Sequence, residues 1–465
     1  MSRRTRSRIL LALVALGAAA PVARAAEAPA GATPAPGDDV AALLKDPAAT
    51  TKVLTLDEAL RSARTHQPAL ELARGALIAA QGQSDSARSG LLPTLNANAT
   101  YTRATSNFVF TPGGSVNPNA PPPPSPSFTT NPLWRFSASA SQLVYDFGET
   151  INKWKAARVA AESQGESVRA TEAQVAYNAR SAFFTARAAK DMVGVARETL
   201  ANQERHLGQV QGYVEVGSRP EIDLTQARAD RATAQVQLIN AENTYDVSKA
   251  LLNQAMGIER SIDYDLSDDE LPAVEGEDGN VETLVDQAQH LRPEMSSLRL
   301  NLNSQELSLR SSRDMYWPNL GLSGSANESG AYLDHLNWNF SGLITLSVPI
   351  LQGGAINAQI RQAQGQLVQA KAQLETQRQQ VRLDVEQARL GIRAAKGAVA
   401  AAEDALANTR DRLRLAEGRY QTGVGNIIEL GDAQLALTTT AAQKVQAEYQ
   451  LYTARAQLLK ALGRP

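Results

Sequence analysis

The sequence contains no cysteine, and aromatic residues make up only 5% of its 465 residues. Without cysteine the chain has no disulfide, no thiol nucleophile, no thiolate metal ligand and no cysteine-linked lipid anchor. Its four histidines, His66, His206, His290 and His335, are scattered without the spacing of a metal site. We therefore expect no metal and no other cofactor. The scarcity of aromatic residues favours long helices packed through small side chains.

The sequence also lacks a strong net charge and long apolar runs. The net charge is −2, so the chain lacks the basic surface of a nucleic-acid-binding protein, and no nucleic acid partner is expected. After the N-terminal region, no segment reaches the roughly 20 consecutive apolar residues that a transmembrane helix needs.

The N-terminal region has the pattern of an export signal. Four arginines precede an apolar run over residues 9–20, and a small-x-small cleavage motif follows. We predict a signal peptide over 1–25 and a disordered Ala/Pro-rich segment over 26–53. An interfacial anchor helix is the alternative to the signal peptide. Structure is expected to begin next, with Thr55 as a helix N-cap.

Proline is absent from two long windows, between Pro132 and Pro220 and between Pro349 and Pro465. Proline breaks helix interiors, so both windows can hold long helices. Each window shows two rows of apolar residues with period seven, offset by four, which is the pattern of a coiled-coil seam. The rows include Val168, Val175, Ala189 and Val210, and then Leu374, Val381, Val385 and Ala388.

The two windows belong to a duplication. Gly217 and Gly423 are 206 residues apart, whereas Pro68 and Pro293 are 225 apart. The change of offset reflects an insertion in the first copy, the Pro/Gly/Ser-rich loop over 111–132, which we expect to be a solvated loop. We predict a first structural repeat over 54–257, an exposed acidic connector over 258–281 and a second repeat over 282–463.

Four segments alternate apolar and polar residues with period two, which predicts β-strands. Their polar positions are almost all Asn, Ser or Thr, as a water-filled lumen requires, and aromatic residues lie in or beside them as in interfacial girdles. A small soluble sheet packed on a core is the alternative. The predicted strands cover about 94–110, 133–147, 319–328 and 336–349, and the aromatic residues are Tyr101, Trp134, Tyr145, Trp317 and Trp338.

Four strands cannot close a barrel, and lipid does not tolerate an open sheet edge. If the strands lie in a membrane, the chain must therefore oligomerise. Three copies, with four strands from each chain, would supply twelve strands.

Each repeat is therefore predicted to run as a helix, a hairpin of two strands, a long coiled-coil helix, a turn and a shorter helix. This duplicated plan resembles the TolC-like outer-membrane efflux protein family, the outer membrane factors of tripartite efflux and type I secretion systems. The resemblance covers nearly the whole mature chain. It rests on the order of the elements and on five stretches: "LLPTLNANATYTR", "YWPNLGLSGSAN", "VYDFGETIN", "VPILQGGAIN" and "RYQTGVGNIIELGDAQLAL". It implies a mainly α fold with a membrane β-barrel portion: a trimeric α-barrel plus a 12-stranded β-barrel, in the cell outer membrane and extending into the periplasm.

The resemblance also implies partners. These are two further copies in a homotrimer, a periplasmic adaptor (membrane fusion protein), an inner-membrane pump of RND or ABC type, and outer-membrane lipid.

The pair Gly423-x-Gly425 could form a phosphate-binding loop or a turn between helices. A phosphate loop would follow a buried strand, whereas a long helical pattern precedes this pair, so we favour the turn. The resemblance implies that this turn, about 420–430, and its counterpart, about 213–223, dock the adaptor at the periplasmic tip.

Single residues of the two turns match the family pattern unequally. Tyr420 and Gly423 match its Tyr-x-x-Gly, whereas Tyr213 falls one residue early relative to Gly217. Family members can carry arginine two residues after the turn glycine, where this chain has Gly425. A tip network that depends on that arginine is therefore not implied.

Glu429 and Asp432 follow the second turn three residues apart, which places them on one helical face. They and Asp223 in the first turn match acidic positions of the family at the closed periplasmic entrance, which implies an acidic ring. The alternative is that a helix N-terminus simply favours acidic residues.

The leading functional interpretation is a passive outer-membrane exit duct that conducts substrates from an inner-membrane pump and a periplasmic adaptor to the exterior. The alternative is a soluble periplasmic coiled-coil adaptor or scaffold protein. An envelope hydrolase is a third class, but the sequence shows no nucleophile–base pair and no metal set, so we expect no enzyme.

Overall fold

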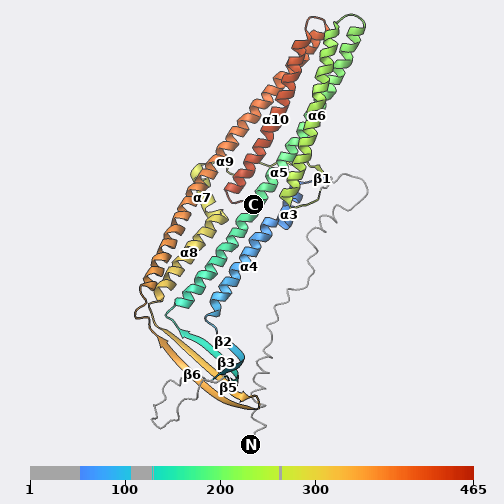
Figure 1. The fold of residues 1–465 in the computed structure, drawn as a ribbon. Helices are drawn as coiled ribbons and strands as arrows, with labels where there is room; N and C mark the ends of the chain where they lie inside the picture. Colours follow the sequence, from blue (N-terminus) through green and yellow to red (C-terminus); the bar gives the residue numbers. More distant parts are fainter. Residues whose placement is uncertain (1–52, 106–127, 129, 261–263, 465) are drawn as a thin grey trace, which may run out of the picture.

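The computed structural model describes residues 53–105, 128, 130–260 and 264–464, and it is an elongated molecule with a small β-sheet at one end (Figure 1). The predicted signal peptide, nearly all of the 26–53 segment and most of the 111–132 loop lie outside the described residues. Two helices of 67 residues, α5 (Glu149–Glu215) and α9 (Ala355–Gln421), run from the sheet to the opposite tip. At roughly 1.5 Å per residue, each is about 100 Å long.

Each half of the chain begins with two short helices rather than the single helix expected. α3 (Leu56–His66) and α7 (Val281–Leu291) have 11 residues each, and α4 (Pro68–Ser89) and α8 (Pro293–Asp314) have 22 each. Proline opens α4 and α8, where its missing N–H costs no helical hydrogen bond, and so it separates each pair. The predicted N-cap of α3 is confirmed, because the Thr55 side chain accepts an N–H from the first turn.

α6 (Glu221–Met256) and α10 (Ile427–Ala461) pack back along α5 and α9 and complete two helical hairpins (Figure 1). The predicted seam is confirmed, since most of its residues, such as Val175 and Val381, are buried between helices. Within the described residues, the apolar contacts form four separate clusters along the molecule rather than one core. None of the helices in these ranges is long and apolar enough to span a membrane.

The stretch between the two repeats differs from the exposed connector that was predicted. Tyr264, Leu266 and Leu271 are buried in a cluster with residues of α3, α5, α6 and α10. β4 (Asp265–Leu266) pairs in parallel with β1 (Val53–Leu54), so Val53 also lies in a strand instead of a disordered segment. The acidic residues suggested a solvated segment, but the apolar residues between them pack against the middle of the helical bundle.

The four long strands form one antiparallel sheet in the order β2-β3-β5-β6, with one hairpin from each half of the chain. β5 continues beyond residue 328 because its pairing with β6 extends to Tyr332 and His335. Residues 106–110, which were expected to prolong the first strand, lie outside the described residues. The observed strands are β2 (Thr94–Thr105), β3 (Thr130–Tyr145), β5 (Asn319–Tyr332) and β6 (His335–Ser347).

Candidate functional site

Both helical hairpins turn at the tip farthest from the sheet (Figure 1), and they use the same backbone motif. Gly217 and Gly423 adopt left-handed φ angles of 75° and 80°. The N–H groups of Ser218 and Val424 donate to the carbonyl oxygens of the residues five positions earlier, at 2.9 and 3.1 Å. The N–H groups of the two glycines donate to the carbonyl oxygens of the residues three positions earlier. This is the Schellman arrangement, which ends a helix at a glycine. It explains why the duplication keeps glycine at both positions.

An apolar cluster joins the two turns. Val210 and Ala227 of the first hairpin pack with Tyr420 and Leu430 of the second, and all four side chains are buried. The contact excludes water from the inner side of both turns. The tip of this chain is therefore one packed unit built from both halves.

Arg219 connects the first turn to the second. Its Nη2 donates to the carbonyl oxygens of Tyr420 at 2.9 Å and Gly425 at 3.4 Å. Its Cζ also lies 4.4 Å from the centre of the Tyr420 ring. Hydrogen bonds from a charged donor are stronger than neutral ones, and the aromatic face adds a cation–π attraction. We call this set of contacts the Arg219 clamp.

Arg219 was not predicted as a site residue. The family pattern pointed to arginine only two residues after Gly423, where the chain has Gly425. The offset of 206 between the repeats places Arg219 at the equivalent position, two residues after Gly217. Gly425 is itself constrained, because a Cβ there would lie 3.0 Å from the backbone nitrogen of Tyr420. Comparing the two repeats at this position would have identified the arginine.

Buried polar groups lie beside the Arg219 clamp. The rings of His206 and Tyr420 are 5.6 Å apart, and His206 and Asp223 are only 6% and 7% exposed. Burial raises the pKa of Tyr420, and the negative charge of Asp223 raises it further. Burial lowers the pKa of His206, although the charges of Asp230 and Asp223 oppose this shift, so the imidazole is neutral at neutral pH.

We predict that acid loosens the tip through His206. Its pKa in the packed tip lies below the ordinary value of 6.5, so a separated tip binds more protons and the packed tip loses stability as the pH falls below 6.5. The protection factor of the Val424 amide, measured by hydrogen exchange, should therefore fall on acidification. In His206→Gln that dependence should be much weaker, and an equally steep fall in this variant would exclude His206 as the cause.

The three carboxylates predicted to form an entrance ring lie in different environments. Glu429 is half-buried, with a carboxylate oxygen 3.5 Å from Nη1 of Arg419, and its N–H is capped by the Asn426 side chain at 2.8 Å. Asp432 is exposed. Asp223 is buried next to Tyr420.

The predicted docking residues also differ in exposure. Tyr420 and Gly425 are buried, and Tyr213 is half-buried with its ring 6.4 Å from that of Tyr420, so these residues support the turns from within. Gly217 and Gly423 are exposed. The same tip exposes four aliphatic side chains, which we call the tip aliphatics: Val216 (77%), Ile222 (70%), Val424 (74%) and Ile428 (68%).

At the other end of the molecule, aromatic side chains lie at two levels of the sheet. Tyr101 pairs directly with Trp134 toward the strand ends away from the helices, and their ring centres are 4.5 Å apart. Next to the helices, Phe147 stacks on Trp317 at 5.4 Å and contacts Tyr145 at 4.8 Å. The stretch of β3 from Trp134 to Tyr145 is about 36 Å long. In a tilted strand this suffices to cross an apolar band of about 25 Å.

The strand register places most apolar and most polar side chains on opposite faces of the sheet. Trp338, the remaining predicted aromatic residue, belongs to the apolar face and pairs with Glu328. One face therefore suits lipid and the other water. Two adjacent rows across the four strands are Ala97, Ala138, Ala326 and Phe340, and then Asn98, Ser137, Asn327 and Asn339.

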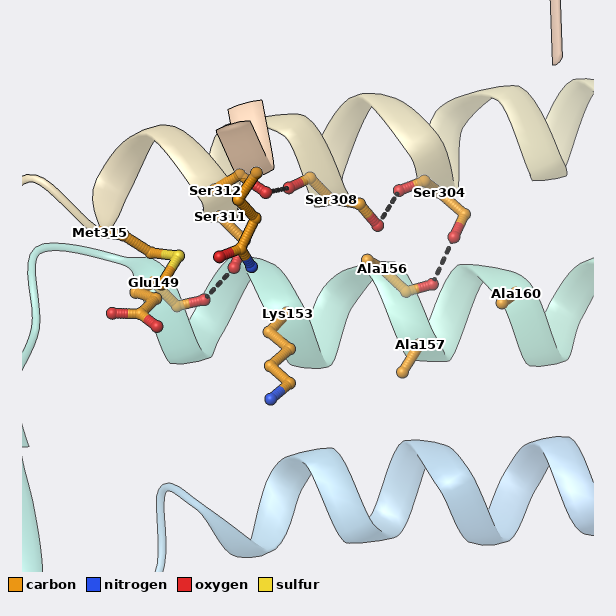
Figure 2. Close-up of a pocket in the computed structure, with 11 residues that line it drawn as sticks. Glu149, Lys153, Ala156, Ala157, Ala160, Ser304, Ser308, Ser311, Ser312 and Met315 are labelled. Carbon is orange, nitrogen blue, oxygen red and sulfur yellow. Dashed lines mark hydrogen bonds between the residues drawn. The ribbon is translucent and has the colours of Figure 1, made fainter. Parts of the chain in front are cut away.

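A pocket of about 440 Å³ lies between α5, α8 and α9, and Figure 2 shows the serines that line it. The hydroxyls of Ser304 and Ser311 donate to the carbonyl oxygens of Ala156 and Glu149 at 2.8 and 2.9 Å, and the other two serines donate to carbonyls of α8 itself. The hydrogen bonds of Ser304 and Ser311 therefore hold α8 against α5, and those of Ser308 and Ser312 lie within α8. Across the described ranges, no group of three or more His, Cys, Asp or Glu residues could hold a metal ion.

Comparisons with known proteins agree with this architecture. A family model described as "Outer membrane efflux protein" matches residues 59–258 and 284–464. The chain is 25% identical over 232 residues to the outer membrane efflux protein BepC of Brucella suis, covering 49% of each chain. It is 24% identical over 332 residues to the outer membrane protein TolC of Escherichia coli, covering 66% of this chain. The chain spans 49% and 62% of the lengths of these two relatives.

Solved structures share the fold over most of the chain. A membrane protein from Pseudomonas aeruginosa has a TM-score of 0.77 at 20% identity, covering 89% of this chain and 91% of that chain. The CmeC outer membrane channel of Campylobacter jejuni has a TM-score of 0.76 at 18% identity, covering 88% and 85%. The fold is that of channel proteins, and the protein is located in the cell outer membrane and extends into the periplasm. The chain belongs to the outer membrane efflux protein family.

Proposed function

We propose that the protein is an exit duct that passively conducts substrates across the outer membrane, and that it works as a homotrimer. The observation that carries this proposal is the two-faced sheet with open edges at β2 and β6. These two strands run antiparallel to each other, so β6 of one copy can pair with β2 of the next. Three copies then close a barrel of twelve strands, which leaves no edge exposed to lipid.

A soluble periplasmic adaptor or scaffold fits the sheet less well. Phe340, Ile344 and Leu346 on the apolar face are 61%, 72% and 64% exposed in the single chain. A continuous apolar face of this kind would aggregate in water, whereas lipid covers it at no cost. The apolar face therefore supports the membrane duct over the soluble alternative.

Cysteine labelling tests the duct directly, because the chain has no thiol of its own. Ser137 and Ala138 are neighbours on β3 and lie on the polar and the apolar face, respectively. In the assembled protein in its membrane, a water-soluble thiol reagent should modify Ser137→Cys and leave Ala138→Cys largely unmodified. Faster labelling of Ala138→Cys would contradict the duct.

We further propose that the tip aliphatics dock a periplasmic adaptor, which links the duct to an inner-membrane pump of RND or ABC type. They surround the two exposed glycine turns, and Ile222 and Ile428 occupy equivalent positions of the two repeats. Exposed aliphatic side chains at the end of a long helical hairpin fit an apolar partner surface better than water. Three copies would present this surface six times around the axis.

Glu429 and Asp432 would occur three times each at the entrance of such a trimer. Six carboxylates at a narrow entrance attract cations and repel anions. Replacing both by alanine should lower the cation/anion permeability ratio in planar bilayers and relieve block by multivalent cations added on the tip side. Glu71→Ala, which removes an exposed carboxylate on α4, is the control. Unchanged selectivity in the double variant would favour the alternative that these acids only complement a helix N-terminus.

A further inference from the structure

The polar face of the sheet has an uneven distribution of charge. Among the residues of β2, β3, β5 and β6, Arg103, Arg135 and Glu328 are the groups charged at neutral pH. Arg103 shares the face of Tyr101, and Glu328 pairs with Phe136, so both belong to the apolar face. Arg135 is therefore the one charged residue of these strands on the polar face.

No described residue neutralises Arg135. It is exposed, it has no ion-pair partner in the described part of the chain, and its cross-strand neighbours are Thr100 and Ser329. The sequence from 104 to 134 contains no Asp, Glu, Lys or Arg, so the connection from β2 to β3 brings no counter-charge. Glu328 on the neighbouring strand β5 lies on the opposite face of the sheet, and Asp334, in the turn that joins β5 to β6, has a carboxylate oxygen 3.1 Å from Nδ1 of His335.

We propose that Arg135 forms a ring of three cations in the lumen, near the outer end of the barrel, and that this ring makes the exit favour anionic over cationic solutes. The inference rests on the proposed trimeric duct. Arg135 lies toward the strand ends away from the helices, next to the Tyr101–Trp134 pair, whereas Glu429 and Asp432 lie at the opposite end of the molecule. The duct would then have an acidic entrance and a basic exit.

The dimensions of a twelve-stranded barrel make the ring effective. Strands about 4.8 Å apart and tilted by about 40° give a backbone ring roughly 24 Å across. The Debye length is about 10 Å in 0.1 M salt and about 30 Å in 0.01 M salt. At moderate salt each arginine therefore dominates the electrostatic potential near its own part of the barrel wall. At low salt the three charges set the potential across the whole lumen. The low-dielectric wall focuses their field into the lumen.

The test measures the local potential with the Ser137→Cys variant, whose single thiol lies two residues from Arg135 on the same face. Singly charged anionic and cationic methanethiosulfonate reagents of similar size are applied to the assembled protein in its membrane, and the ratio of their reaction rates is recorded. In about 0.1 M KCl, adding Arg135→Gln should lower the anion/cation rate ratio about three-fold or more. In about 1 M KCl, where the Debye length is about 3 Å, the difference should vanish.

Two further variants separate charge from shape and from position. Arg135→Lys should keep the ratio of the parent Ser137→Cys protein. Arg103→Gln removes an arginine from the opposite face of the same sheet and should leave the ratio unchanged. With a reactive thiol in Ser137→Cys, a ratio that Arg135→Gln does not alter, or that Arg103→Gln lowers equally, would overturn the ring. An unreactive thiol in Ser137→Cys, together with a reactive one in Ala138→Cys, would instead overturn the proposed duct itself.

Discussion

Replacing Arg219 by glutamine is expected to separate the two helical hairpins at the tip and to raise the resting conductance of the reconstituted trimer. The variant removes two hydrogen bonds from a charged donor to the carbonyl oxygens of Tyr420 and Gly425, and it removes the cation above the Tyr420 ring. Contacts of this kind contribute about 2 kcal/mol, which corresponds to a roughly 30-fold increase in the population of separated tips.

Two further variants make the result specific. Arg231→Gln removes another arginine of the first hairpin, but its partner Glu204 is exposed and such pairs contribute about 0–1 kcal/mol, so little change is expected. Arg219→Lys keeps the charge without the fork of donors and should be intermediate. Conductance and amide exchange at the tip are the measurements. Equal effects of the Arg219 and Arg231 variants would show that the Arg219 clamp does not hold the hairpins together.

Gly423→Val is expected to disrupt the second turn and to weaken adaptor binding without impairing insertion into the outer membrane. Gly423 has a φ of 80°. This conformation destabilises a residue that has a Cβ by about 1–2 kcal/mol or more, and the cost is largest for a β-branched residue. No atom lies within 4 Å of a Cβ built there, so the cost comes from the backbone and not from a clash. The turn also positions Val424, one of the tip aliphatics.

Gly418→Val is the matched control, because it makes the same change five residues earlier. Gly418 lies inside α9 and has no positive φ, and a Cβ built there also meets nothing within 4 Å. Photo-cross-linking from positions 216 and 424 in transport-competent cells measures adaptor contact, and the amount of trimer in the outer membrane measures insertion. Loss of cross-linking in both variants, or in neither, would contradict the role assigned to the turn.

Much of the fold could be predicted from the sequence because its signals are periodic. The heptad rows and the proline-free windows indicated α5 and α9, and the period-two segments indicated the strands. The offset of 206 connects the two turns: both glycines have positive φ and both make the same hydrogen bonds. Such patterns depend on neighbouring residues, which a single sequence shows directly.

The rest depended on contacts between distant parts of the chain. Arg219 matters because Tyr420 lies beside it, about 200 positions later, and no local pattern reveals that contact. The same packing buries Asp223 and Tyr420, which the resemblance had assigned to the periplasmic entrance and to an adaptor-docking turn. The connector was predicted to be exposed because its buried residues, such as Tyr264 and Leu266, are too few to give a periodic apolar pattern in the sequence.

The most direct test of the exit duct is the native mass of the protein extracted from the outer membrane in mild detergent. The sheet predicts a complex of three copies that stays in the membrane fraction until detergent is added, because only a closed barrel leaves no strand edge in lipid. A stable monomer in detergent, or a protein recovered from the periplasm without detergent, would contradict the central claim.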